Sequence, residues 1–553
     1  MIQLSRRLLG AAVALTAALA ACDSGTGTSD DLFAPTGLAV TASSPTSVTV
    51  TFNAVPGATG YEVQRAPGTG TTFTTIGTTS GSPFSDTGLE PTATYNYRVA
   101  AVRGGEKSDY TAGQAVTLLN RPVVTISTDV TANRRFDSDT VYLLGAFVHV
   151  ANGATLTIEE GTRIEGLPNS ALFILRGAKI LAIGTAAKPI VFTSNRAAGQ
   201  RQPGDWGGLI IVGNGIINRA DPILLEGSNT GGTNYAVTYS GGTNNADDSG
   251  ELRYVRVEFA GFGPAPDQEL NSFTFAAVGS GTRLSYLQSM AGLDDSYEWF
   301  GGAVDAKYLV SYESGDDHFD ASEGFQGRNQ FLIAYQDTII PPRNGSGNTS
   351  SDPQGIENDG CNGANCIAGF NSQPYTVPVF ANFTLVGLRT TPVSVPAAGG
   401  RGMVLRRGTG GYYVNGIVAR WPVAVSIRDA ATNDRITAGD LQVKNLLSVE
   451  NATLFESGTE RYSVDAAANG IESSAATAAS LFAAFPAPTA AHTVASFDWT
   501  PAAGSPAATG GLATFTGSLA TRAGTAVTGT GYRGAADPAG PRWWQGWTVY
   551  YRN

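Results

Sequence analysis

Short hydrophobic runs separated by Gly, Asn and Ser turns follow one another along almost the whole chain. In the runs at 147–166, 175–195 and 205–214, apolar residues alternate with polar ones or form brief continuous stretches. These runs are rich in Val, Ile, Tyr and Phe and poor in helix formers, which favours strands over helices. The expected fold class is therefore all-β.

The middle of the chain repeats with a fixed step, and the repeat includes its acidic residues. Asp294 and Asp295 are followed 22 residues later by Asp316 and Asp317. The same step relates Glu298 to Asp320, Tyr286 to Tyr308, Leu287 to Leu309, Leu309 to Phe331, and Val310 to Leu332. A constant period of this size indicates a solenoid in which each unit is one β-coil. Stacked coils place like residues directly above one another.

From about Arg121 to the end, the chain resembles right-handed parallel β-helix proteins of the pectin-lyase-like class. It is more closely similar to bacterial surface proteins and lipoproteins with no assigned activity. The resemblance implies a solenoid over 121–553, with a cap at 122–140 and a second cap at the C-terminal end. Two polar insertions, at 225–250 and 337–378, are expected to project from one side as a binding face.

Residues 33–118 follow a different pattern of short alternating strands at 47–52, 60–65 and 94–102. The stretch 89–95, Leu-Glu-Pro-Thr-Ala-Thr-Tyr, has the arrangement of a tyrosine corner. In these features the segment resembles a fibronectin type III domain. The resemblance implies a β-sandwich that acts as a spacer in front of the solenoid.

The first residues form a targeting segment. Arg6 and Arg7 precede an apolar stretch, and the sequence Leu-Ala-Ala-Cys ends at Cys22. This resembles a bacterial lipoprotein signal, with 1–21 removed, Cys22 lipidated and 22–32 forming a flexible tether. The resemblance implies a membrane anchor in the cell envelope, at the outer rather than the inner membrane. The alternative is an ordinary secretory signal with an incidental cysteine.

Composition and cysteine use narrow the choice of partners. The net charge is −11, and a nucleic-acid partner would require a basic face, so none is expected. Besides Cys22, the chain has only Cys361 and Cys366, five residues apart in a polar loop. Outside the cytoplasm such a pair is most simply a disulfide, because a metal site would need more ligands.

The doubled acidic pairs are the strongest indication of chemistry. Parallel strands lie about 4.8 Å apart, and two carboxylates at that distance repel by roughly 3 kcal/mol at an effective dielectric constant near 20. Three explanations remain open: solvated turns, a bridging Ca²⁺ ion, or a protonated carboxyl acting as a general acid. The candidate Ca²⁺ ligands are Asp294, Asp295, Glu298, Asp316, Asp317 and Asp320.

A catalytic interpretation lacks its usual partners. Gly315-Asp316-Asp317 resembles the Gly-Asp-Asp element of polygalacturonases, but the Gly-His-Gly and Arg-x-Lys elements of that family do not occur in the sequence. The arginine pattern of pectate lyases is also missing. A binding or adhesion protein for glycan, matrix or protein is therefore favoured. A polysaccharide lyase or glycoside hydrolase, and a structural stalk, remain as alternatives.

Aromatic clusters offer a second, weaker hypothesis. Exposed flat rings are platforms for sugars, but such clusters more often belong to a core or a cap, because large rings bury so much area. The candidates for stacking on a glycan are Trp299, Trp543, Trp544 and Trp547.

Overall fold

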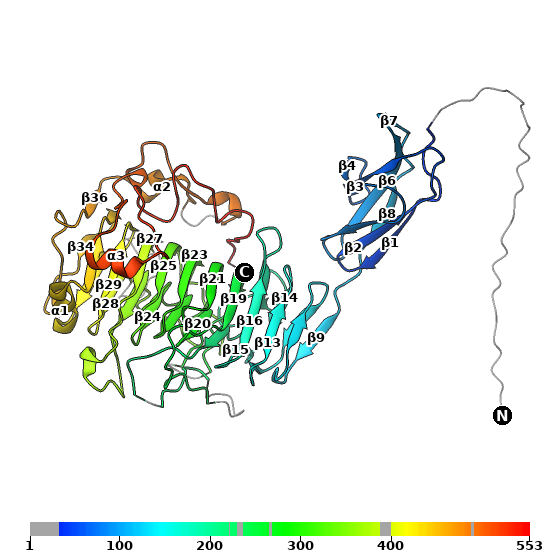
Figure 1. Ribbon diagram of the computed structural model, residues 1–553. Helices are drawn as coiled ribbons and strands as arrows, with labels where there is room; N and C mark the ends of the chain where they lie inside the picture. Colours follow the sequence, from blue (N-terminus) through cyan, green and yellow to red (C-terminus); the bar gives the residue numbers. More distant parts are fainter. Residues whose placement is uncertain are drawn as a thin grey trace, which may run out of the picture. The chain divides into compact units, whose positions relative to one another are not determined.

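The computed structural model describes residues 32–220, 222–228, 236–264, 268–387, 400–487 and 491–552 (Figure 1). The chain divides into two compact units, with the boundary between Asn120 and Arg121. The predicted signal peptide, the lipidation site Cys22 and the tether up to residue 31 lie outside the described residues. Among the described residues, no helix has the length and apolar character needed to cross a bilayer.

The first unit is a sandwich of two antiparallel sheets. One sheet has the order β1 (Ala39–Ser44), β2 (Ser47–Thr51), β5 (Phe84–Thr87). The other has the order β4 (Thr74–Thr79), β3 (Gly60–Pro67), β6 (Thr94–Arg103), β7 (Glu106–Lys107), with β8 (Gln114–Thr117) pairing with β6.

Alternation along the strands produces the core of this sandwich. Val48 and Val50 of β2 are fully buried, whereas the residues between them are not. The rings of Phe52 and Tyr61 lie 4.6 Å apart between the sheets. The Tyr95 hydroxyl accepts a hydrogen bond of 3.3 Å from the Glu90 N–H, as expected for a tyrosine corner.

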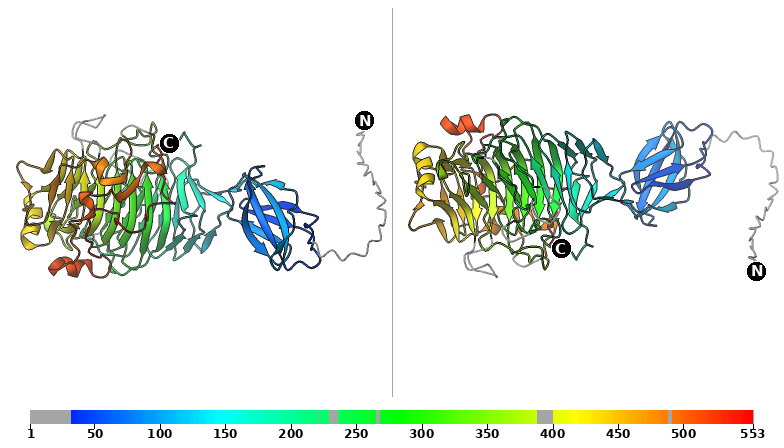
Figure 2. Two further views of the ribbon diagram at one scale, coloured as in Figure 1. Left: turned by 90° about the horizontal axis from the view of Figure 1, so that it is seen from above. Right: turned by 90° about the horizontal axis from the view of Figure 1, so that it is seen from below.

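The second unit is a parallel β-helix built from two long sheets (Figures 1 and 2). The larger sheet has 17 strands: β9 (Val123–Ile126), β10 (Arg134–Phe136), β11 (Val141–Leu144), β13 (Thr155–Ile158), β14 (Arg163–Gly166), β16 (Lys179–Ile183), β17 (Ile190–Ser194), β19 (Gly250–Glu258), β21 (Arg283–Met290), β23 (Asp305–Tyr312), β25 (Arg328–Tyr335), β27 (Val379–Val386), β29 (Gly411–Val414), β30 (Ile417–Ala419), β32 (Leu441–Lys444), β33 (Leu447–Val449) and β36 (Glu472–Ser474). In the first coils these strands form two parallel rows, β10–β13–β16 and β9–β11–β14–β17, which both join β19. The long strands β19, β21, β23, β25 and β27 then pair in turn, and after β27 the rows separate again as β29–β32 and β30–β33–β36. The expected N-terminal cap at 122–140 therefore supplies β9 and β10 to the solenoid itself.

The second sheet lines the other side of the same coils. Its order is β12 (Phe147–Val150), β15 (Ala171–Ile174), β18 (Leu209–Val212), β20 (Phe273–Ala276), β22 (Tyr297–Phe300), β24 (Asp320–Ser322), β26 (Ile356–Asp359), β28 (Arg401–Arg406), β31 (Val423–Arg428), β34 (Thr453–Phe455), with β35 (Arg461–Tyr462) antiparallel to β31. The remaining elements are the pair β37 (Phe482–Ala484) and β38 (Asp498–Pro501), the helices α1 (Ala430–Ala438), α2 (Ala478–Leu481) and α3 (Gly517–Ala523), and the 3-10 helices η1 (Gly369–Asn371), η2 (Val494–Ser496) and η3 (Pro506–Ala508).

The long strands of the larger sheet bend at one repeated position. Tyr254, Tyr286, Tyr308 and Phe331 all occupy this position with positive φ, between 51° and 67°. Their rings stack in sequence with centroid separations of 4.3, 4.5 and 5.1 Å. A positive φ is costly for a bulky residue, so the stacking of these rings compensates for a backbone strain that the four coils share.

The repeat of 22 residues is confirmed in part. Between β21 and β23, Leu287 lies beside Leu309, which is the expected step. In the next coil the prediction is wrong by one residue, because Leu309 lies beside Leu332 rather than Phe331. The extra residue keeps Phe331 at the bend, where its ring stacks on Tyr308.

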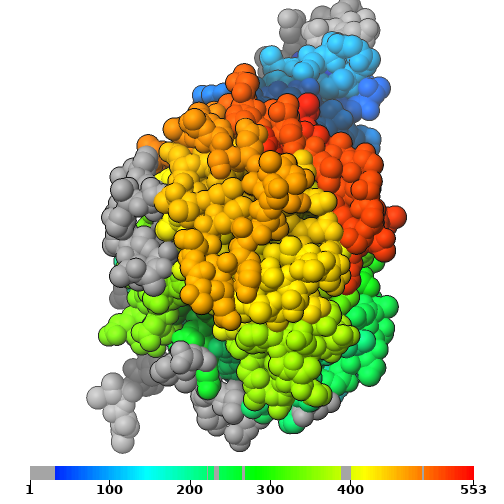
Figure 3. All heavy atoms as spheres, turned by 90° about the vertical axis from the view of Figure 1, so that its left-hand side faces the viewer, coloured from blue at the N-terminus to red at the C-terminus, as the bar shows by residue number. Residues whose placement is uncertain are grey.

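The C-terminal stretch does not cap the last coil as expected. Residues 543–552, here called the C-terminal strap, run back along the solenoid to its middle coils (Figure 2). Arg256 of β19 donates to the Trp547 carbonyl at 2.8 Å, and the Gln288 side chain of β21 bonds to both the N–H and the carbonyl of Val549. The end of the solenoid formed by its last coils and the segments that follow them is drawn in yellow and orange in Figure 3.

Candidate cation site

A cavity of about 400 Å³, here called the acidic pocket, opens on the outer side of β22, β24 and β26. Ten carboxylates line it together with one serine and one arginine. The lining residues are Glu226, Glu269, Asp294, Asp295, Glu298, Asp316, Asp317, Asp320, Ser350, Asp352, Glu357 and Arg406. All six predicted metal ligands are thus brought together in one cavity.

Strand register places three of the carboxylates in a row. Glu298 of β22 lies beside Asp320 of β24, which lies beside Glu357 of β26. The next residue in each of the first two strands, Trp299 and Ala321, is buried in the core. Because successive side chains of a strand point to opposite faces, the acids point outward.

The turn before each strand adds a second row. The Asp317 N–H donates to Asp295 Oδ1 at 2.8 Å, so the two successive turns are bonded through their acids. Gly315 makes this close approach possible, because a Cβ there would lie 1.9 Å from the carbonyl oxygen of Leu293. The glycine of the Gly-Asp-Asp sequence is therefore required by the close approach of the backbone, apart from any chemical role of the two aspartates.

Four of the lining acids were not singled out in the sequence. Glu226 comes from the first polar insertion, and Asp352 and Glu357 come from the second; Glu269 precedes β20. These residues lie outside the 22-residue repeat, so the repeat could not predict them. Only the expectation that the two insertions form a binding face indicated that acids from them could join the site.

Burial and mutual repulsion raise the pKa values of the acidic pocket. Burial raises the pKa of Asp316 to about 7, with Asp352 adding repulsion. Burial raises the pKa of Glu357 to about 8, with repulsion from Asp359 partly offset by Arg406. The same causes, burial first and neighbouring carboxylates second, raise the pKa well above the usual range for Asp294, Asp295, Glu298, Asp317 and Asp320.

The protein supplies few compensating donors. Asn271 donates to Glu298, and Gln354 N–H donates to Asp317 Oδ1 at 2.5 Å. Arg406 donates to Glu357 and to Asp359 of β26. Within the described part of the chain, Asp320 Oδ1 is a buried oxygen without a hydrogen-bond partner. A buried carboxylate oxygen in this position favours a ligand that the chain itself does not provide.

The carboxylates are close enough to share cations. Three groups have ligand oxygens within 4.8 Å of one another: Asp294, Asp295 and Asp316; Asp295, Glu298 and Asp320; and Asp317, Asp320 and Glu357. Asp295 and Asp320 each belong to two groups, so each can bridge neighbouring positions. A set of ligands made only of oxygen atoms suits a hard cation such as Ca²⁺ and fits poorly with zinc.

The prediction that these tryptophans stack on a glycan is wrong for the three whose rings are buried. Trp299 is fully buried inside the solenoid, with its ring 5.8 Å from Phe275. Trp544 and Trp547 belong to the C-terminal strap and are 2% and 1% exposed. Trp543 is partly buried, and its indole N–H donates to the Ala535 carbonyl. Trp299, Trp544 and Trp547 therefore have no free face for a sugar, and the apolar area of the last two packs the strap onto the coils.

The predicted disulfide between Cys361 and Cys366 is present. Its loop lies against the chain near Arg219, whose Nε donates to the Ala364 carbonyl at 3.1 Å. The Ala220 N–H donates to the Asn365 carbonyl at 2.9 Å. The disulfide loop therefore holds the segment that carries Arg219.

A second cavity, of about 310 Å³ and here called the aromatic pocket, shares Glu226 with the acidic pocket. Its lining combines apolar, aromatic and hydrogen-bonding side chains: Arg219, Leu224, Leu225, Glu226, Gly227, Tyr239, Gln268, Phe300 and Glu323.

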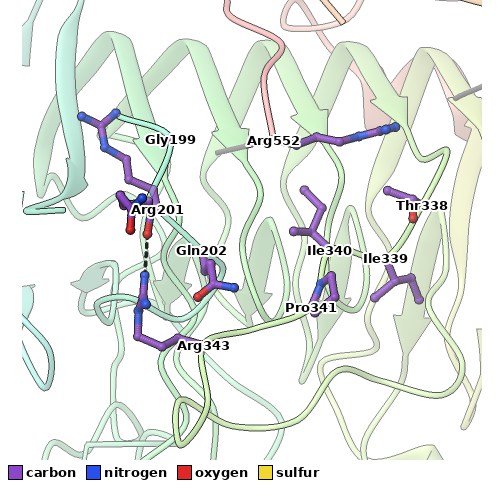
Figure 4. Close-up of a pocket in the computed structure, with 10 residues that line it drawn as sticks. Gly199, Arg201, Gln202, Thr338, Ile339, Ile340, Pro341, Arg343 and Arg552 are labelled. Atoms are coloured by element: carbon purple, nitrogen blue, oxygen red, sulfur yellow. Dashed lines mark hydrogen bonds between the residues drawn. The ribbon is translucent and has the colours of Figure 1, made fainter. Parts of the chain in front are cut away.

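A third cavity, of about 470 Å³, has a different character (Figure 4). Arg201, Arg343 and Arg552 approach it from three distant parts of the chain. Each already has a carboxylate nearby; Arg343 Nε, for example, lies 2.5 Å from Asp205. This cavity is therefore bordered by internal ion pairs.

The model of the pectate-lyase-like beta helix domain matches residues 125–499, well over half of the chain. The chain belongs to this family. The fibronectin type III domain model matches residues 33–114, in front of the β-helix domain.

Two further kinds of relative cover short segments only. A poly(3-hydroxybutyrate) depolymerase of Ralstonia pickettii is 40% identical over 91 residues, which is 16% of this chain and 16% of that protein. An Fn3-like protein from Clostridium thermocellum is 35% identical over 15% of this chain and 90% of that chain, with a TM-score of 0.15. The FN5 domain of Drosophila Lar is 23% identical over 16% of this chain and 98% of that chain, also with a TM-score of 0.15.

Proposed function

We propose that this protein is a cell-envelope binding protein whose acidic pocket holds Ca²⁺ and, through the cation, a glycan. Membership in the pectate-lyase-like family indicates a carbohydrate-active or surface protein. The observation that carries the finer proposal is the ratio of charges in the acidic pocket: ten carboxylates and one arginine around about 400 Å³. An arrangement of this kind is stabilised most directly by bound divalent cations.

The proposed setting is the surface of a membrane. Cys22 carries the lipid in this proposal, and the fibronectin type III domain separates the β-helix domain from the bilayer. Two or more acyl chains on one residue suffice for stable anchoring, since each buried CH₂ contributes about 0.8 kcal/mol. The outer membrane is the proposed location, because a glycan or surface protein would be accessible there.

Metal titration tests the cation site. Ca²⁺ added to the chelator-treated protein is expected to raise its melting temperature, since a ligand that binds only the folded state stabilises it. The double substitution Asp316→Asn and Asp317→Asn is expected to remove this rise and the heat of Ca²⁺ binding in calorimetry. A matched control is Asp248→Asn, at an exposed carboxylate paired with Lys179 outside the acidic pocket.

The outcomes are distinct. The proposal is supported if Ca²⁺ still raises the melting temperature of Asp248→Asn and no longer raises that of the double variant. If Ca²⁺ does not raise the melting temperature of the chelator-treated, unsubstituted protein, the proposed cation site is refuted.

A glycoside hydrolase is the second candidate, and one observation favours it. Asp316 has a pKa of about 7 and lies in a group whose carboxylate oxygens are within 4.8 Å of one another. One protonated and one ionised carboxyl about 5 Å apart is the arrangement used by retaining glycosidases. Release of reducing sugar from a polysaccharide, lost in Asp316→Asn, would establish hydrolysis. Binding without release would exclude it.

A further inference from the structure

The topology of the second sheet brings three arginines together near its last strands. Arg428 of β31 lies directly opposite Arg461 of β35 in an antiparallel pair. Ile427, the residue before Arg428, belongs to the core, so Arg428 points outward. Arg401, the first residue of the neighbouring strand β28, extends to the same place. These three residues are here called the arginine cluster. Like charges directly opposite each other in a sheet are destabilising, so the cluster requires an anion.

One carboxylate of the chain, that of Glu456, serves all three arginines. Its oxygens lie 2.8 Å from Arg401 Nη2, 3.2 Å from Arg428 Nε and 2.8 Å from Arg461 Nε. Although burial opposes its ionisation, hydrogen bonds from Ser426 and Arg401 lower the pKa of Glu456 to about 2. Glu456 is therefore a permanent anion at the centre of the cluster.

The carboxylates of the chain do not balance the cluster. Among the described residues, Asp352 supplies the second carboxylate in contact with it, 2.8 Å from Arg401 Nη1. The three guanidiniums thus exceed the two carboxylates by one charge. Burial lowers the pKa of Arg428, and repulsion from Arg401 adds to this effect. The cluster therefore favours a further anion from outside the chain.

The cluster also offers hydrogen-bond donors. Arg428 Nε donates to Ser426 and Glu456, and neither terminal nitrogen of Arg428 has a hydrogen-bond partner among the described residues. Arg461 donates from Nε to Glu456 and from Nη1 to backbone carbonyls, which leaves Nη2 as a further donor. The side chains of Arg428 and Arg461 are 15% and 29% exposed, so these nitrogens are held in place and remain open to solvent. Donors from two guanidiniums match the several oxygens of a phosphate or sulfate group.

We propose that the arginine cluster is a binding site for a tetrahedral oxyanion, a phosphate or sulfate group, held by the terminal nitrogens of Arg428 and Arg461. Arg401 contributes charge. Glu456 holds the guanidiniums in position and, as an anion itself, limits the affinity of the site. The site lies on the same sheet as the acidic pocket but takes a ligand of opposite charge, and it does not depend on the proposed Ca²⁺ site.

Calorimetry with small anions tests the inference. The purified protein is titrated at constant ionic strength with inorganic phosphate, sulfate and acetate, in chelator so that no anion binds through Ca²⁺. Phosphate or sulfate is expected to bind at one site, and acetate at least about fivefold more weakly, because it has fewer oxygens and less charge. Arg461→Gln, at the more exposed donor, is expected to weaken the binding about tenfold through loss of a charge-assisted hydrogen bond.

Glu456→Gln gives an expected change of the opposite sign. It removes the competing anion, so phosphate is expected to bind at least about fivefold more tightly. Thermal unfolding of each variant without phosphate checks that it is folded. Arg283→Gln is the matched control, because Arg283 is 73% exposed and pairs with Glu251 outside the cluster. This control is expected to bind phosphate as the unsubstituted protein does.

Glycerol phosphate distinguishes two sources of the oxyanion. If it binds as tightly as inorganic phosphate, the site accepts a phosphate group on a larger molecule. If only the inorganic ions bind, the site is supported for free anions alone. The inference is overturned if neither phosphate nor sulfate binds, if acetate binds as tightly, or if Arg461→Gln leaves the affinity unchanged. A folded Glu456→Gln variant without tighter binding also overturns it. Because Ca²⁺ is absent throughout, failure of the proposed cation site would leave all these results unaffected.

Discussion

Buried acids on the two outer sides of the same coils have opposite surroundings. Beneath the C-terminal strap, Glu258 and Glu313 are 0% and 1% exposed, and each has an arginine of the chain against it. Arg256 lies 3.0 Å from Glu258, and Arg552 of the strap lies 2.6 Å from Glu313. On the other side, ten carboxylates and one arginine, Arg406, line the acidic pocket, and Asp352 at its edge also pairs with Arg401 at 2.8 Å.

The difference separates a structural role from a binding role. Attraction to a fixed arginine offsets part of the desolvation cost of a buried carboxylate, and the ion pair holds two segments together. Stacked carboxylates without such partners repel one another and destabilise the cation-free protein. A cation that binds between them removes this repulsion and stabilises the folded state. The strap side is therefore expected to depend on the chain alone, and the acidic side on its ligand.

The largest expected effect is on the strap side. Trp547→Ala removes a ring that is 1% exposed and lies edge-on to Tyr254 at 5.6 Å. Loss of a buried tryptophan costs about 3–5 kcal/mol, so the midpoint of urea unfolding is expected to fall sharply, with or without Ca²⁺. A midpoint that falls only when Ca²⁺ is absent would contradict the division between the two sides.

The same substitution on both sides gives the sharpest comparison. Glu313→Gln leaves Arg552 without its close partner and is expected to destabilise the protein by about 3 kcal/mol. Glu298→Gln removes one of the mutually repelling charges and keeps the bond from Asn271, so it is expected to stabilise the chelator-treated protein by about 1 kcal/mol. Urea unfolding of both variants in chelator measures the two changes in the free energy of unfolding. Changes of the same sign would refute the comparison.

The pH dependence of stability is expected to come mainly from the acidic side, where seven carboxyls have raised pKa values, although burial also raises the pKa of Glu313 on the strap side to about 7. The folded-state pKa values of about 7 for Asp316 and about 8 for Glu357 lie above those of the unfolded chain. The folded protein therefore binds more protons between about pH 4 and pH 8, and its stability falls as the pH rises through this window. In chelator, the melting temperature should fall by several degrees from pH 5 to pH 8. Ca²⁺ should reverse the fall at pH 8, whereas Asp316→Asn should reduce it.

The smallest expected effect comes from the disulfide. Cys361→Ala with Cys366→Ala opens a short loop, and the entropy of closing so short a loop corresponds to about 2 kcal/mol at most. Because the loop holds the segment of Arg219, the loss should appear as faster hydrogen exchange around residues 218–220 rather than as unfolding of the coils. Uniformly faster exchange along the solenoid would show that the bond stabilises more than its own surroundings.

Several parts of the site were predictable because they follow the repeat. The step from Asp294 to Asp316 gives the stacking of the turns, and alternation along a strand gives the outward direction of Glu298. The tryptophans were not predictable in the same way, since a cluster such as Trp543 and Trp544 has the same sequence in a core as on a surface. Their burial depends on where the strap runs, and nothing local specifies that path.

The amino-acid sequence by itself determined the all-β class, the two-part layout and the step of 22 residues from β21 to β23, because hydrophobic alternation and a local repeat act over short distances. Tertiary structure alone decided that Glu226, Asp352 and Glu357 join the repeated acids, and that Arg552 returns to Glu313 from 239 residues away. The physical reason is that electrostatic balance depends on distance in space. Two sets of similar acids on one solenoid therefore differ only in which distant cations the fold brings to them.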